Sequence, residues 1–106
     1  MNIITIVIAR DFTDTPGGRY KNEGEFSGEE FRNCLLRPKY EEAVRENKEL
    51  FIDLDGCMGY PSSFLDESFG GLAREYPGKD ISKRIILKSD DQPGLVNEIM
   101  NMIKKG

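Results

Sequence analysis

Apolar residues fall along the chain in three short runs, and each run is followed by a stretch with helical spacing. The first run is nearly continuous and β-branched: Ile3, Ile4, Ile6, Val7 and Ile8. Such a run is typical of a strand buried on both faces, so it predicts a central strand of a parallel sheet. Residues 50–54 predict a second buried strand, and Ile81 with residues 84–87 predicts a third.

Three helices are predicted between and after these strands. Ser27 and Glu30 form a capping box, so a helix begins there and continues to about Asn47, with a break or restart at Pro38. A second helix begins at Ser63, and Pro77 with Gly78 ends it. Its apolar face is Leu65, Phe69, Leu72 and Tyr76, and that of a closing helix is Leu95, Val96, Ile99, Met102 and Ile103.

The alternation of strands and helices predicts one α/β domain over residues 1–106. We expect a small, mostly parallel sheet of three to five strands with flanking helices. Residues 10–24 are rich in turn-forming residues and predict a loop, with a short edge strand around Arg19 and Tyr20. Asp55 and Asp90 follow predicted strands, and the ends of parallel strands are where open α/β sheets place their binding sites.

Charge and hydropathy narrow the classes of function. The net charge is −4 and basic residues are scattered among acids, which disfavours a nucleic-acid partner because phosphate binding needs clustered Lys and Arg. The longest uncharged apolar stretch, residues 3–9, is too short to span a membrane and has no basic leader. We therefore expect a cytoplasmic protein without a membrane partner.

The residues that most often carry metals and cofactors are scarce. The chain has no His, and Cys34 and Cys57 form no CxxC pattern, so the sequence predicts two reduced thiols and neither a metal site nor a cofactor. Without His the commonest general base is missing, and neither Cys has the positive neighbours that mark a nucleophile.

A pair of carboxylates at the end of the second predicted strand admits an enzymatic alternative. Asp53, Asp55 and Gly56 resemble the DxDG motif of haloacid-dehalogenase-type phosphatases, and Ser62, Lys88, Asp90 and Asp91 mimic its later motifs. That family builds its site on the first strand of a larger sheet, whereas this pair follows the second. We therefore favour a structural role for both carboxylates and predict that the chain is not an enzyme.

The sequence contains two glycine pairs, and neither is predicted to form a phosphate-binding loop. Gly70 and Gly71 lie inside a predicted helix, where they indicate close packing against the sheet or against a partner. Gly17 and Gly18 precede Arg19 in the first loop, where a turn is the simplest interpretation.

A set of short motifs runs through the middle of the chain. They are Gly18-Arg19, Ser27-Gly-Glu-Glu-Phe31-Arg32, Pro38, Phe51-Ile-Asp53-Leu-Asp55-Gly56 and Ser63-Phe-Leu-Asp-Glu-Ser-Phe-Gly-Gly-Leu72. In this combination the chain resembles a bacterial and phage family of STAS-like domains of unknown function, named for its likeness to the sulfate-transporter and anti-sigma-factor-antagonist domain. The resemblance covers about residues 18–87 and is most specific in its last block.

This resemblance implies a regulatory protein-interaction domain similar to anti-sigma-factor antagonists. In those proteins an Asp-Ser-Ser-Gly helix start carries the Ser that a partner kinase phosphorylates. Asp66 then matches the Asp and Ser68 the phosphorylated Ser, whereas Glu67 and Phe69 depart from the pattern. The implied partner is a histidine-kinase-like ATPase or an anti-sigma factor, and the implied contact residues are Tyr60, Ser63, Asp66, Glu67, Ser68 and Gly71.

Further expectations attach to this block. We expect Asp66 to close a capping box with Ser63, and Glu67 to project from the first turn of the helix. Phosphorylation of Ser68 would be opposed by the neighbouring carboxylates, so the sequence favours an unmodified Ser68 packed beneath the loop. An alternative function with the same fold is a small acidic inhibitor, of phage type, that blocks a host enzyme.

Overall fold

The computed structural model describes residues 2–106 and has an α/β fold built on one parallel sheet. Its strands are β1 (Ile3–Val7), β2 (Glu49–Asp53) and β3 (Ile85–Lys88), in the order β1-β2-β3. Ile4 lies opposite Leu50, and Leu50 opposite Ile85. This arrangement confirms the predicted fold class.

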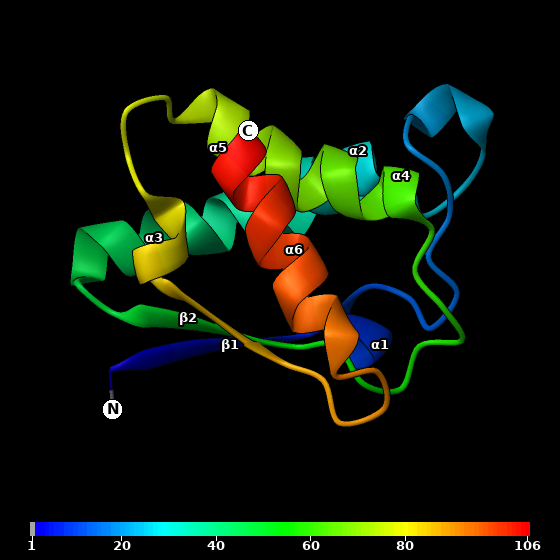
Figure 1. Cartoon of the computed structure of the whole chain (residues 1–106), viewed down its shortest axis with the longest axis horizontal. Helices are drawn as coiled ribbons and strands as arrows, with labels where there is room; N and C mark the ends of the chain where they lie inside the picture. The colour runs from blue at the N-terminus through cyan, green and yellow to red at the C-terminus, as the bar shows by residue number, and fades with distance from the viewer. Residues whose placement is uncertain (1) are drawn as a thin grey trace.

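All the long helices lie on one face of this sheet, because two successive right-handed crossovers in the same direction return the chain to the same side (Figure 1). The first crossover contains α2 (Gly28–Phe31), η2 (Arg32–Leu36) and α3 (Arg37–Glu46). The second contains α4 (Ser62–Leu65), η3 (Asp66–Gly70), α5 (Gly71–Glu75) and the short η4 (Ile81–Lys83). Helix α6 (Gly94–Lys105) closes the chain and packs on η3.

The strands alternate between a buried and an exposed face. Ile4 and Ile6 of β1 are buried, whereas Ile3 is 46% exposed. The prediction that the first strand is central and buried on both faces is therefore wrong. β1 lies at an edge of the sheet, and no described helix covers the opposite face, so only alternate residues enter the core.

Two wide turns with π-type hydrogen bonding shape the crossover helices. The first, η2, ends at Leu36, two residues before Pro38. Because a wide turn re-routes backbone hydrogen bonds, the helix absorbs the missing N–H of Pro38 and runs unbroken to Glu46. Of the predicted break or restart at Pro38, the break is absent, whereas regular α-helix does restart at Arg37 with Pro38 in its first turn. The predicted cap is present: the Glu30 N–H donates to Ser27 Oγ at 3.0 Å.

Aromatic rings join the two crossover helices at their amino-terminal ends. The Phe31 ring stacks on Phe64 at a centroid distance of 5.8 Å and lies 6.2 Å from Phe69, and all three are fully buried. Gly28 permits this approach, because a Cβ there would lie 2.5 Å from the Phe64 carbonyl oxygen.

The loop between β1 and α2 contains two short helical turns, α1 (Ile8–Asp11) and η1 (Lys21–Glu23). The edge strand predicted around Arg19 and Tyr20 is absent from this part of the described chain. Phe26 fixes the loop instead: its ring meets Phe12 edge-on at 5.6 Å, and its carbonyl accepts from the Gly17 N–H. The loop therefore lies against the start of the helical layer.

Candidate functional site

Four charged side chains meet at the carboxyl ends of β2 and β3. Lys88 Nζ lies 3.0 Å from Asp55 Oδ2, 3.2 Å from Asp90 Oδ2 and 3.8 Å from Asp53 Oδ2. Asp53 Oδ1 accepts from the Asp55 N–H at 2.9 Å. The two carboxylates of the phosphatase-like motif thus lie together as predicted, with a lysine between them.

Asp55 closes the loop that follows β3. Its carboxylate accepts the N–H groups of Asp90 and Asp91 at 2.9 Å and the ammonium group of Lys88. The two backbone N–H groups are the main reason that the pKa of Asp55 falls to about 2, and Lys88 lowers it further. Asp55 is therefore an ionised structural anchor whose oxygens already have partners.

Cys57 and Tyr60 form a small polar cluster beside this anchor. The Tyr60 hydroxyl donates to the Leu54 carbonyl at 2.8 Å and lies 3.0 Å from Cys57 Sγ. Burial raises the pKa of the Cys57 thiol and, more strongly, that of the Tyr60 phenol. Neither group is activated as a nucleophile or base near neutral pH.

A network of paired charges, here called the ionic belt, ties the first loop to both crossover helices. Arg19 Nη1 lies 2.7 Å from Asp66 Oδ2 and 3.4 Å from Glu67 Oε1. Arg32 Nη1 lies 2.7 Å from Glu67 Oε2, and Arg32 Nε lies 2.9 Å from Glu75 Oε1, an ion pair without hydrogen-bond alignment. The hydrogen bond from Arg19 lowers the pKa of Asp66.

The Gly70–Gly71 pair makes room for the ionic belt. A Cβ on Gly71 would lie 2.3 Å from Arg32 Nη1, and a Cβ on Gly70 would lie 2.8 Å from Asp66 Oδ1. The glycines therefore allow the Arg32 guanidinium to lie against the helix backbone. The predicted close packing is present, but it is with an arginine of the neighbouring helix instead of the sheet.

Two expectations about the helix start are wrong. Helix α4 begins after Pro61 without a side-chain cap, and Asp66 binds Arg19 instead of closing a box with Ser63. Glu67 does not project: its side chain is 12% exposed and points at Arg32. The wide turn η3 shifts the helix faces, which brings Glu67 inward.

The structure separates the six predicted contact residues into three groups. Asp66, Glu67 and Gly71 lie in the ionic belt, and Tyr60 and Ser63 are half-buried at the loop and helix start. Ser68 is fully buried, and its hydroxyl donates to the carbonyls of Phe64 and Leu65 at 2.8 and 3.3 Å. In this conformation Ser68 lies out of reach of a modifying enzyme.

Residues 27–95 of the chain match a known protein family. The model of the family described as a STAS-like domain of unknown function matches residues 27–95, which hold both crossover helices, β2 and β3. The chain belongs to this family. No curated protein and no solved structure matches it.

Sequence reasoning missed the most exposed large apolar side chain among residues 2–106 of this STAS-like domain. Met58, in the loop between β2 and α4, is 83% exposed, and Pro61 and Ser62 beside it are exposed as well. We call residues 56–63 the Met58 rim. A single Met in a glycine-containing loop has no periodic signal, so only the structure shows that its side chain faces solvent.

Groups of metal ligands and membrane-spanning helices are both absent from the part of the chain that the structure describes. Within residues 2–106 no three His, Cys, Asp or Glu side chains are grouped so that they could hold a metal ion. In the same range, no helix combines the length and the hydropathy that crossing a bilayer requires.

Proposed function

We propose that this STAS-like domain is a non-catalytic regulatory module that binds a protein partner through the Met58 rim, in the manner of anti-sigma-factor antagonists. The observation that carries the proposal is the 83% exposure of Met58. Met is unbranched and adapts well to irregular partner surfaces, so an exposed Met in a loop beside a helix start can serve as the apolar anchor of a contact.

The location of the rim supports the same proposal. It follows the second strand and leads into a helix start, which is the segment by which true anti-sigma-factor antagonists meet their partners. Ser62 is exposed there and Ser63 half-buried, so polar contacts can surround the apolar anchor. A histidine-kinase-like ATPase or an anti-sigma factor is the class of partner we propose.

A non-catalytic role is supported by how the nearby reactive groups are occupied. Asp53 and Asp55 are held by Lys88 and by backbone N–H groups, and the Tyr60 hydroxyl is bonded to Leu54. A general base or nucleophile needs a free electron pair aimed at a substrate. Each of these groups has a partner within the fold, and Asp55 and the Tyr60 hydroxyl are each hydrogen-bonded to it.

Site-directed photo-crosslinking in the native host tests this proposal. A benzoylphenylalanine at position 58 should capture a discrete protein, whereas the same probe at the exposed Glu98 of α6 should not. The captured protein, once purified, should bind Met58→Asp at least about tenfold more weakly than the parent. Identical capture at both positions, or equal affinity for Met58→Asp, would show that the Met58 rim is not a contact surface.

A further inference from the structure

A second surface of different chemistry lies at the opposite end of the sheet, beside the amino ends of the strands. Two adjoining hollows of about 210 and 340 Å³ share Tyr40, Val44 and Lys79. They lie between α3 and the loop from α5 to β3, on the left of Figure 1. We call them together the amino-end groove.

The groove has an apolar wall. The Tyr40 and Tyr76 rings pack with centroids 5.1 Å apart, and Val44 beside them is 42% exposed, although it belongs to a helix whose apolar residues otherwise face inward. The Tyr76 hydroxyl donates to Glu41 at 2.6 Å, which fixes the ring. A fixed aromatic surface with a hollow of about 210 Å³ fits one bulky apolar side chain.

Four cations and three carboxylates line the two hollows, so cations are in slight excess there although the whole chain is acidic. Arg45, Lys79 and Lys83 are among these cations and make no ion pair with any residue from 2 to 106. Most Lys and Arg side chains elsewhere are paired. The others without an ion pair are Lys21, Arg84, Lys104 and Lys105, and of these Arg84 lines the same groove.

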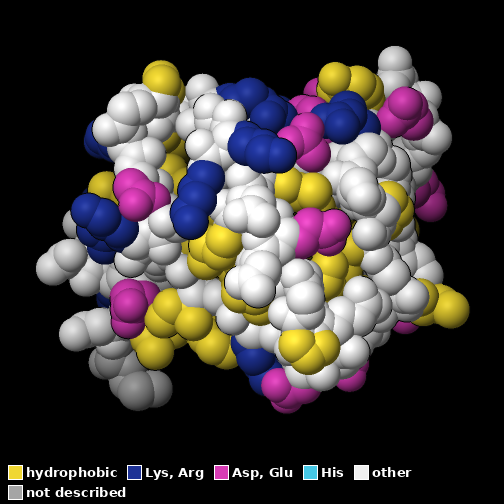
Figure 2. Space-filling model, in the orientation of Figure 1, with side chains coloured by type: hydrophobic (Ala, Val, Ile, Leu, Met, Phe, Trp, Pro, Cys, Tyr) yellow, Lys and Arg dark blue, Asp and Glu magenta, His cyan; other side chains and the backbone are white. Residues whose placement is uncertain are grey.

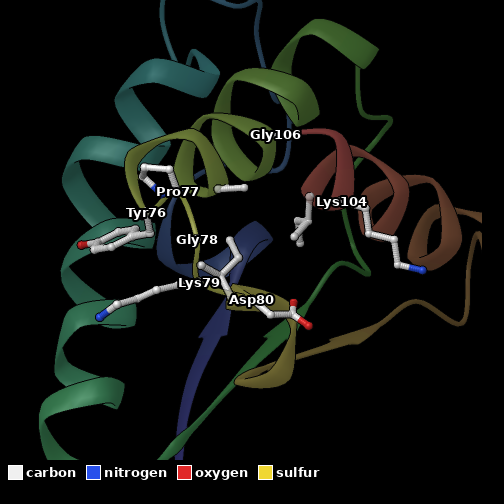
Figure 3. A pocket seen from close by; sticks show the side chains of 10 residues that line it. Tyr76, Pro77, Gly78, Lys79, Asp80, Lys104 and Gly106 are labelled. Atoms are coloured by element: carbon white, nitrogen blue, oxygen red, sulfur yellow. The ribbon is translucent and has the colours of Figure 1, made fainter.

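A third hollow of about 400 Å³ continues the groove past Tyr76 toward the end of α6. Figure 3 shows the Tyr76 ring and the Lys79 side chain pointing toward α3, while Lys104 extends from the other side of this hollow. In Figure 2, drawn in the orientation of Figure 1, dark-blue and magenta side chains both lie on the left, where the groove is. Unpaired cations therefore flank the apolar wall on more than one side.

We propose that the amino-end groove binds an acidic peptide segment that carries one bulky apolar side chain. The apolar side chain would lie on Tyr40, Val44 and Tyr76, and its flanking carboxylates would face Arg45, Lys79 and Lys83. A peptide fits better than a nucleic acid because Glu41, Glu49 and Asp80 also line these hollows. They would repel a backbone with a charge at every nucleotide, whereas a peptide can place its charges away from them.

Fluorescence anisotropy with labelled probe peptides tests the proposal. The first probe has about nine residues, with Asp and Glu around a central Leu; the second replaces the Leu by Ala, and the third replaces the acids by Lys. The first should bind with a Kd below about 1 mM at low salt and lose at least about threefold in affinity at 0.3 M salt. The other two should bind at least about fivefold more weakly.

Matched variants locate the binding. Lys79→Glu and Val44→Ser should each weaken the first probe at least about fivefold, whereas Lys21→Glu, an equal change of charge on an exposed side chain of the first loop, should leave its affinity unchanged. The proposal is wrong if no probe binds, if Lys79→Glu and Lys21→Glu behave alike, or if a single-stranded DNA of about nine nucleotides binds as tightly as the first peptide. None of these results bears on the Met58 rim, so this proposal fails or holds separately from the proposed function.

Discussion

The two charged regions of this STAS-like domain use arginine and lysine in opposite ways. In the ionic belt the guanidinium of Arg32 lies within 3 Å of the carboxylates of Glu67 and Glu75, and its side chain is only 14% exposed. In the amino-end groove Lys79 and Lys83 are exposed and have no carboxylate within ion-pair distance among the described residues.

This difference separates charges that hold the fold together from charges that are free to meet a ligand. In a half-buried ion pair each charge stabilises the other, because removing one partner leaves the remaining charge desolvated and uncompensated. Exposed single charges contribute little to folding and keep their full attraction for an incoming anion. The predictions below test this separation, beginning with the belt.

Removal of the Glu67 carboxylate should have the largest effect. Glu67→Ala leaves Arg32 and Arg19 facing a half-buried space with less negative charge, so we expect the free energy of unfolding to fall by about 2–4 kcal/mol. Urea denaturation measures this change. Glu98→Ala on the exposed surface of α6 is the control and should stay within about 0.5 kcal/mol of the parent. Equal midpoints for the two variants would mean that the belt adds no stability.

A side chain at Gly71 should disturb the belt from within. Gly71→Ala places a Cβ 2.3 Å from Arg32 Nη1, so the guanidinium must move, and we expect a loss of about 1–3 kcal/mol. Gly59→Ala is the matched control, since a Cβ at that position meets no atom within 4 Å. Denaturation midpoints of the two variants should differ clearly. A stable Gly71→Ala would show that Arg32 has an alternative position of equal energy.

A side chain at Gly78 should have a smaller effect than one at Gly71. Gly78 follows α5 and has a φ of +82°, a conformation that L-residues rarely adopt. Alanine there should therefore cost about 1 kcal/mol even though no atom blocks its Cβ.

Local signals in the sequence predicted most of the fold. The cap at Ser27, the helix end before Pro77 and the second strand depend on residues close together in the chain, and the structure confirms them. The position of β1 could not be predicted in this way. Whether a strand is central depends on the order in which strands pair, and a β-branched run gives no information on that order.

The ionic belt escaped sequence analysis for two physical reasons. Its pairs join residues far apart in the chain, such as Arg19 with Asp66 and Arg32 with Glu67, which no local pattern links. In addition, the wide turn η3 changes the number of residues per turn. Helix faces assigned at 3.6 residues per turn are then out of phase with the structure. The sequence therefore places Glu67 on the exposed face of the helix, although its side chain is mostly buried.

The strand-end anchor allows a test by pH. The folded pKa of Asp55, about 2, lies below its ordinary value near 4, so its ionised form stabilises the fold above pH 4 and this contribution is lost as the pH falls from about 4 to 2. Asp55→Asn should therefore be less stable than the parent at pH 6, and the difference should shrink toward pH 2. Asp14→Asn, at a position for which no side-chain bond is observed, is the control. A difference that is constant from pH 6 to pH 2 would contradict an anchoring role for the Asp55 charge.

Removing the charges of two lysines in the amino-end groove should change the free energy of unfolding least. This variant therefore distinguishes the groove from the ionic belt most directly. The double variant Lys79→Gln with Lys83→Gln removes two exposed cations that have no ion-pair partner, so the free energy of unfolding should change by less than about 0.5 kcal/mol. Arg32→Gln, which removes one paired cation of the belt, is the matched comparison and should lose more than about 1 kcal/mol. Urea midpoints of both variants at low and high salt provide the measurement. If the double lysine variant loses as much stability as Arg32→Gln, the groove lysines stabilise the fold as the belt arginine does. Their lack of ion-pair partners would then not indicate a ligand site.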